Sequence, residues 1–151
     1  MLRVSKLTDY AVVVLVRLSA DMPCGLGPVQ TSPAIACATG VPEPTVAKVL
    51  KALSAAGLVL SQRGARGGYR LIRPLETISV ADVIAAIDGP IALTACVDGS
   101  LGACDVHAMC AVKGRWDLVN DAIRQSLTAI TLADMRDASL PLRLSTLIPA
   151  E

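Results

Sequence analysis

Residues 41–71 read VPEPTVAKVLKALSAAGLVLSQRGARGGYRL, and this stretch decides the fold of the chain. Its first half has apolar residues at helical spacing, with prolines near the start of the helix and a glycine at its end, where each is tolerated. Its second half has two short runs of β-branched, leucine or tyrosine residues on either side of RGARGG, a turn of hairpin type. The stretch predicts a helix followed directly by a β-hairpin.

Shorter helical signals lie before this stretch. The pair Ser32 and Pro33 is typical of a helix start, with Ser32 as the N-cap, and Gly40 is expected to stop that helix. Two helices separated by a turn at Gly40 form a helix-turn-helix, and the hairpin behind them makes it a winged helix. Apolar residues over 7–20 predict an amphipathic first helix with Thr8 as its N-cap.

The remaining elements give a mainly α chain with a small β-hairpin wing. Ser79 and Asp82 resemble a capping box that opens a helix over VADVIAAID, which a Gly-Pro pair closes. From Lys113 to about Ile130, apolar residues three or four positions apart predict a longer helix, and a short final turn starts at Thr131. We expect the apolar stripe of the longer helix to bind a partner chain. The stripe consists of Trp116, Val119, Ile123, Leu127 and Ile130.

Charge is divided unevenly along the 151 residues, although the net charge is only +1. Residues 1–73 contain nine Lys or Arg and three Asp or Glu, whereas residues 74–151 contain five and ten. No acidic residue lies between Glu43 and Glu76, while six basic residues do, and a surface of one sign suits a polyanion. The first residues are polar and charged, and Arg17 interrupts the apolar run that follows, so we expect a cytoplasmic protein with no membrane partner.

The basic residues fall where a winged helix contacts double-stranded DNA. The second helix of a helix-turn-helix enters the major groove, and arginines at a wing tip suit the narrow minor groove. Any one of these residues alone is more often an ordinary surface charge. Together they predict DNA binding through the helix, where Glu43 also faces outward, and through the hairpin. The predicted DNA-binding residues are Thr45, Lys48, Lys51, Arg63, Arg66 and Arg70.

Three of the five cysteines, Cys96, Cys104 and Cys110, lie within fifteen positions in a segment of little apolar content. Structural cysteines usually sit in apolar helices or strands, as we expect for Cys37. Clustered thiolates suit an iron–sulfur cluster, zinc or copper(I). His107 could complete a zinc site of three cysteines and one histidine, and spacing alone does not choose between zinc and a cluster. No acid/base pair accompanies the thiols, so we expect neither an enzyme nor a small-molecule substrate.

Taken together, the motifs resemble the Rrf2 family of winged-helix transcription regulators of the IscR and NsrR type. The resemblance covers nearly the whole chain except the tail. Two motifs look most like the branch that regulates the SUF iron–sulfur assembly genes: KLTDY and VPEPTVAKVLK. The other stretches that resemble the family are LRVSKLTDYAV, GLVLSQRGARGGYRL, the three cysteines, RWDLVNDAI and ITLADM.

The resemblance implies a homodimeric repressor of palindromic promoter DNA that senses iron–sulfur status, redox stress or nitric oxide. It implies a 2Fe–2S or 4Fe–4S cluster on Cys96, Cys104 and Cys110. IscR-type members have a histidine ligand three residues after the third cysteine, but Lys113 stands there. NsrR-type members use an aspartate from the first helix of the partner subunit, and the matching residue is Asp9, which we prefer over His107 as fourth ligand.

The expected organisation follows from the same resemblance. Residues 1–90 form a winged helix-turn-helix DNA-binding domain, and residues 91–112 form a cluster-binding loop. A dimerisation helix and a short final turn occupy residues 113–136, and residues 137–151 form a tail.

Overall fold

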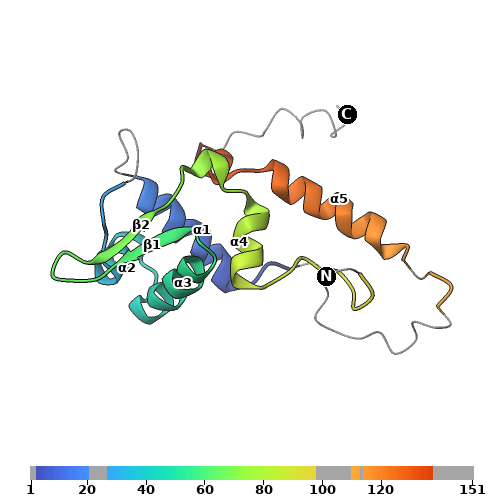
Figure 1. Cartoon of the computed structure of the whole chain (residues 1–151), viewed down its shortest axis with the longest axis horizontal. Coiled ribbons are helices and arrows are strands. Elements are labelled where there is room, and N and C mark those ends of the chain that lie inside the picture. The colour runs from blue at the N-terminus through green and yellow to red at the C-terminus, as the bar shows by residue number, and fades with distance from the viewer. Residues whose placement is uncertain (1–2, 21–26, 98–109, 113, 138–151) are drawn as a thin grey trace.

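The computed structural model describes residues 3–20, 27–97, 110–112 and 114–137. Helices dominate it, and its one hairpin is antiparallel, which confirms the mainly α fold with a winged helix-turn-helix. Figure 1 shows the hairpin turn and α5 at opposite ends of the molecule. The elements are α1 (Lys6–Ser19), α2 (Ser32–Thr39), α3 (Glu43–Ala55), β1 (Val59–Gln62), β2 (Gly68–Leu71), the 3-10 helix η1 (Leu75–Thr77), α4 (Val80–Ile87), α5 (Trp116–Ala129) and α6 (Leu132–Asp137).

The helix-turn-helix consists of α2, the turn at Gly40 and α3. Gly40 has a φ of 72°, the left-handed conformation that glycine adopts without steric cost, and it ends α2 as predicted. The N-cap of α2 is Thr31, one residue before the predicted Ser32, because the Thr31 side chain accepts the Ala34 N–H. Pro42 caps α3, so the second helix starts immediately after the turn.

The start of α1 differs from the prediction that Thr8 caps it. The N-cap is Ser5, whose backbone is extended and whose Oγ accepts the Thr8 N–H at 3.1 Å. Thr8 lies inside the helix with 1% of its surface exposed, and its Oγ1 donates to Asp88 Oδ2 at 2.7 Å. Both residues are good cap formers, and the extended backbone at Ser5 decides between them. Thr8 therefore joins the first turn of α1 to the end of α4.

The wing is anchored to the segment before α2. Strands β1 and β2 pair from Val59 opposite Leu71 to Gln62 opposite Gly68. Tyr69 also exchanges two backbone hydrogen bonds with Gln30, of 2.9 and 2.8 Å. A Cβ at Gly68 would lie 2.5 Å from the Gln30 carbonyl oxygen, so only glycine permits this approach.

The core lies between α1, α3, the hairpin and α4, and α6 returns to it. Leu132 is fully buried in this core and Ala133 nearly so, although both follow α5 in the chain. Two backbone hydrogen bonds hold this return in place: Val80 N–H to Ile130 O and Leu132 N–H to Ile78 O, both 2.9 Å. The C-terminal end of α5 is thus tied to the start of α4.

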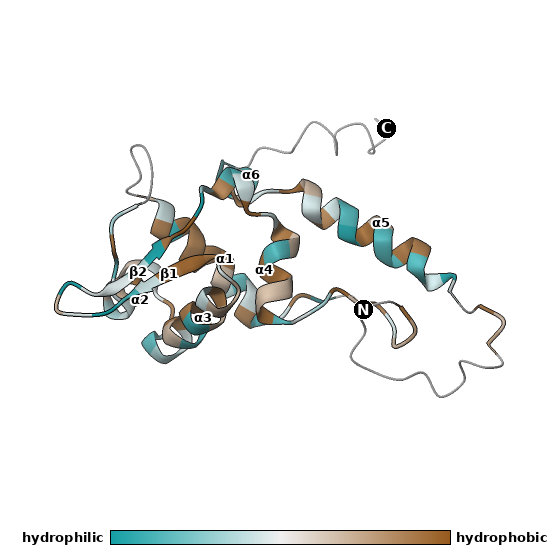
Figure 2. Cartoon of the chain, in the orientation of Figure 1, coloured by the Kyte–Doolittle hydropathy of each residue, from teal (hydrophilic) through white to brown (hydrophobic). Residues whose placement is uncertain are grey.

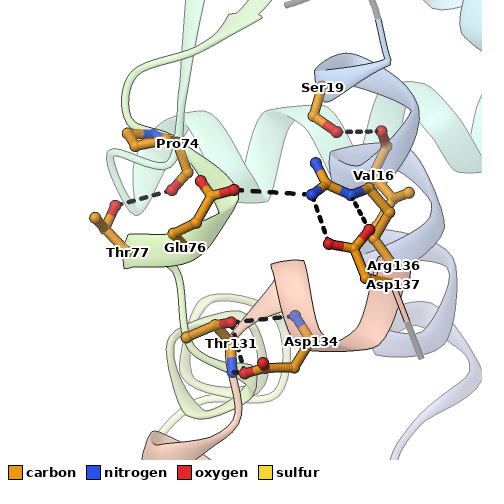
Figure 3. Close-up of polar contacts among 9 residues, drawn as sticks. All are labelled: Val16, Ser19, Pro74, Glu76, Thr77, Thr131, Asp134, Arg136 and Asp137. Atoms are coloured by element: carbon orange, nitrogen blue, oxygen red, sulfur yellow. Dashed lines mark hydrogen bonds and ion pairs between the residues drawn. The ribbon is translucent and has the colours of Figure 1, made fainter. Parts of the chain in front are cut away.

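Two reciprocal caps stabilise the helices on either side of this tie. Ser79 and Asp82 form the predicted capping box at α4, with hydrogen bonds of 3.1 and 3.0 Å. At α6, Asp134 accepts the Thr131 N–H and hydroxyl, while its own N–H donates to Thr131 Oγ1 (Figure 3). The side-chain and backbone hydrogen bonds from Thr131 lower the pKa of Asp134. Arg136 pairs with Asp137 at 2.6 Å and reaches Glu76 of η1 at 3.8 Å.

The contact between Thr8 and Asp88 provides a test of the fold. Thr8→Val keeps the shape of the side chain but leaves Asp88 without its donor, so we expect the free energy of unfolding to fall by about 1–3 kcal/mol. Urea denaturation followed by circular dichroism measures this change. Thr8→Ser should restore most of the loss. Thr128→Val is the matched control, because Thr128 is exposed and bonds only its own helix at Arg124 O. An equal loss in both valine variants would contradict a stabilising role for this partly buried contact.

Candidate nucleic-acid interface and cysteine segment

The apolar row of α3 determines which side chains the helix exposes. The helix buries four core residues completely, so its opposite side faces outward. Lys48 and Lys51 are exposed there, Glu43 is exposed in the first turn, and Thr45 is half-buried. A carboxylate in the first turn is favoured by the helix dipole. The core residues are Val46, Val49, Leu50 and Leu53.

The wing turn provides two more cations. Arg63 and Arg66 lie exposed between β1 and β2, and Figure 2 shows a hydrophilic tip on the hairpin. Arg70 on β2 is half-buried, and its Nε is enclosed with no hydrogen-bond partner among the described residues. We call the four exposed cations the basic face: Lys48, Lys51, Arg63 and Arg66.

The four cations of the basic face are available to bind phosphate groups. Within the described ranges, none of its four members makes an ion pair. Arg73, which lies in the same acid-free stretch of sequence, instead pairs with Asp82 at 3.3 Å. The four cations can therefore approach phosphates without breaking an existing ion pair.

The cysteine segment is described only at its two ends. Cys96 and Cys110 are half-buried free thiols, and Thr94 Oγ1 lies 3.1 Å from Cys96 Sγ, within hydrogen-bond reach. Cys104, His107 and Lys113 lie outside the described residues. Asp9 is exposed in the first turn of α1. In the described part of the chain, no three Cys, His, Asp or Glu side chains gather where they could hold a metal ion.

The sequence analysis missed Asn120, the one buried residue of α5, with 3% of its surface exposed. Its Oδ1 accepts the Leu93 N–H at 3.1 Å, and its Nδ2 donates to Ile91 O at 3.1 Å. Asn120 stands four residues after Trp116 and three before Ile123. A polar residue inside that apolar row is the signal that could have identified it.

The apolar stripe of α5 is exposed at its N-terminal end in the single chain, whereas Ile123, Leu127 and Ile130 are half-buried. The helix begins at Trp116, three residues later than predicted. Trp116 is 41% exposed, Val119 is 45% exposed and the neighbouring Leu118 is 77% exposed. Figure 2 shows apolar and polar residues alternating along this helix. Such a contiguous exposed apolar surface is typical of a binding surface.

A groove of about 820 Å³ separates α5 from the start of α1 and the end of α4. Ile123 and Leu127 line it from α5, Arg3 and Lys6 from the start of α1, and Asp88 from the end of α4. The middle of α5 is therefore not tightly packed against the rest of the chain. The hydrogen bonds at Asn120 and Ile130 attach it on either side of this groove.

The prediction that Cys37 belongs to the core is wrong. Cys37 is exposed, because α2 packs inward through Ile35, which is fully buried, and Ala36, which is partly buried. Two residues further along a helix, a side chain points about 200° away, which places Cys37 on the outer surface.

Comparison with known proteins identifies the family. A profile of the Rrf2 family, described as iron-dependent transcriptional regulators, matches residues 4–138. The chain belongs to the Rrf2 family. Within the described residues of this Rrf2 protein, no helix is long and apolar enough to cross a membrane.

Two relatives of the Rrf2 chain align with it over more than two thirds of their own length. A Mycobacterium tuberculosis protein whose name describes an HTH-type transcriptional regulator is 35% identical over 141 residues, 93% of this chain and 84% of the relative. Protein rrf2 of Nitratidesulfovibrio vulgaris is 36% identical over 107 residues, 70% of this chain and 71% of the relative.

Two solved structures are also similar to it. The structure of CymR, described as the global cysteine regulator of B. subtilis, has a TM-score of 0.66 and 28% identity, covering 91% of this chain and 98% of CymR. T. potens IscR has a TM-score of 0.63 and 29% identity, covering 99% of this chain and 94% of IscR. This Rrf2 protein is a DNA-binding transcriptional regulator and not an enzyme.

The wing arginines provide a test of the interface in this Rrf2 regulator. Replacing both, as Arg63→Ala with Arg66→Ala, should weaken promoter binding and make the slope of log K against log salt shallower by about 2, one for each lost phosphate contact. Gel-shift titrations at several salt concentrations measure the slope. The control variant, Arg115→Ala with Arg124→Ala, removes two exposed arginines at the opposite end of the molecule. Equal slopes in both variants would exclude the wing from the interface.

Proposed function

We propose that the chain is a homodimeric repressor whose affinity for promoter DNA depends on an iron–sulfur cluster held by Cys96, Cys104 and Cys110. The observation that supports this most is the state of Cys96 and Cys110, free and half-buried at the two ends of one segment. The family description as iron-dependent regulators agrees with it. We further propose that the protein works in the cytoplasm, with iron–sulfur status, oxidants or nitric oxide as its signal.

The donor chemistry of the described residues fits such a cluster. Thiolates are the ligands that iron–sulfur clusters use, and hydrogen bonds to sulfur tune their potential, a part that Thr94 could play at Cys96. When bound, a cluster supplies a centre that reacts with oxidants and nitric oxide. For the fourth ligand we prefer Asp9, which is exposed, over His107. A carboxylate holds iron less tightly than a thiolate, so the iron bound by Asp9 would be lost first.

The contacts of α1 suggest how this site could affect DNA binding. Asp9 follows Thr8, which hydrogen-bonds Asp88 at the start of the chain segment leading to Cys96. Helix α1 also packs against α3, the helix with the exposed lysines. We propose that gain or loss of the cluster shifts α1 and, through it, α3, a coupling between two sites.

Dimerisation and DNA contact complete the proposal. The exposed stripe of α5 would join two copies, and the organisation would follow the units expected above: 1–90, 91–112, 113–136 and 137–151. The DNA contacts would be the basic face together with Thr45 and Arg70. The SUF branch remains a proposal on the motifs KLTDY and VPEPTVAKVLK, since the similar structures include both an IscR and a cysteine regulator.

Anaerobic purification tests the cofactor. The protein should be brown, absorb visible light and contain iron and acid-labile sulfide, because three thiolates hold the cluster. Cys96→Ser and Cys110→Ser should each lose most of the colour and iron. Cys37→Ser, the same chemical change at an exposed cysteine of α2, should keep both. A colourless anaerobic sample with one zinc per chain would replace this proposal with a structural zinc site of three cysteines and His107.

The fourth ligand has its own test. Asp9→Ala, reconstituted anaerobically, should show an altered visible spectrum and lose its cluster several times faster than the unaltered chain, because one iron loses its protein ligand. Asp121→Ala removes an exposed carboxylate from α5 and is the control. An unchanged spectrum and lifetime in Asp9→Ala would exclude Asp9 and direct the search to His107.

A further inference from the structure

We infer that Asn120 is a positioning residue that holds the start of the cysteine segment against α5 and so sets where Cys96 lies. Its importance for the cofactor rests on the proposed function, whereas its effect on the backbone does not. The inference depends on described residues only: Asn120, the backbone of residues 91–97 and the first turns of α5.

The side-chain amide of Asn120 is hydrogen-bonded at both its oxygen and its nitrogen. It is nearly inaccessible to solvent, and both ends of its amide bond the backbone of one short stretch, at Ile91 O and Leu93 N–H. A buried amide that uses its acceptor and a donor on one segment specifies the position of that segment, because an unpaired buried polar group is costly. Burial is confined to this residue within α5.

The stretch that Asn120 holds continues directly to Cys96. Thr94 follows Leu93, and its hydroxyl lies 3.1 Å from Cys96 Sγ. The Thr94 carbonyl accepts the Val97 N–H at 3.4 Å, and the Val97 side chain is buried. Residues 94–97 therefore form a compact turn, and two residues separate Leu93, which makes the last bond to Asn120, from Cys96.

Asn120 also follows the other end of the segment, ten residues after Cys110 in the sequence. Helix α5 begins six residues after Cys110, and Asn120 is one turn into that helix. The same side chain thus connects the chain entering the cysteine segment with the helix that leaves it. If Cys96 and Cys110 bind one cofactor, the two ends of the segment must keep a constant separation.

The position of Asn120 indicates a local role and not a contribution to the stability of the whole fold. It does not belong to the hydrophobic core of α1–α4, and α5 has a second attachment where Val80 bonds Ile130. The groove between these two attachments leaves the middle of α5 loosely packed. Loss of the Asn120 contacts should therefore open the entry to the cysteine segment locally and leave the winged helix folded.

The first experiment uses the full chain without any cofactor. Asn120→Ala should speed amide hydrogen exchange at Leu93 by about tenfold, the effect of losing one hydrogen bond that gates local opening. Alkylation of Cys96 should accelerate as well, while the amide of Leu50, which is buried in α3, exchanges at an unchanged rate and reports that the fold is intact. Gln125→Ala removes an exposed amide from the same helix and should leave Leu93 and Cys96 unchanged. Unchanged exchange at Leu93 in Asn120→Ala would overturn the inference.

A second variant separates the two hydrogen bonds. Asn120→Asp keeps an acceptor for the Leu93 N–H but sets its second carboxylate oxygen against Ile91 O, which it repels. The contact at Ile91 should therefore be lost, while Leu93 stays more protected than in Asn120→Ala. If Asn120→Ala fails to fold, which the exchange rate at Leu50 would reveal, Asn120→Asp supplies the test. Equal exchange at Leu93 in Asn120→Asp and in a folded Asn120→Ala would contradict the bond to Oδ1.

The last experiment measures the cofactor. In anaerobic protein treated with a chelator, Asn120→Ala should lose its visible absorption several times faster than the unaltered chain, and Gln125→Ala should not. If the unaltered chain binds no cluster, the proposed function fails, while the exchange and alkylation data still test Asn120. If the cluster lifetime is unchanged although Leu93 is deprotected, Asn120 positions the backbone without controlling the cofactor, and that part of the inference is wrong.

Discussion

Burial of the apolar row of α3 is the constraint on which the rest of the structure depends. Four side chains of this helix are fully enclosed by α1, the hairpin and α4. Each such side chain contributes about 1.5–3 kcal/mol when it is buried. That burial fixes the rotation of α3, so Lys48 and Lys51 must point outward. The exposed cations of the helix and of the wing turn are therefore a consequence of the core.

A second group of contacts, all polar, connects this core to the cysteine segment. Thr8 bonds Asp88 where that part of the chain leaves α4, Asn120 bonds the backbone at Ile91 and Leu93, and Val80 bonds Ile130 at the end of α5. Asp88, Ile91 and Leu93 line the groove, whereas the bond between Val80 and Ile130 lies at the edge of the core. Such contacts specify position and can open locally, which is what a segment that reports a bound group to α1 would need.

One fold can serve regulators that respond to different signals. CymR, described as a cysteine regulator, and T. potens IscR have similar TM-scores against this chain. The winged helix accounts for DNA binding by this regulator, whereas the identity of the signal depends on side chains placed on that scaffold. In the function that we propose for this chain, those side chains lie between α4 and α5 and in the first turn of α1.

The sequence by itself determined the local structure. The helix-turn-helix, the hairpin and the capping box at Ser79 were predictable because periodicity, glycine, proline and cap residues act within a few positions of one another. Sequence reasoning placed the N-cap of α1 at Thr8 and Cys37 in the core, and it overlooked Asn120. Only the tertiary structure decided these, together with the return of α6 to the core and the bridge from Gln30 to Tyr69. Each depends on a partner distant in the chain, and whether a polar or apolar side chain is buried is settled by the surface that such a partner presents.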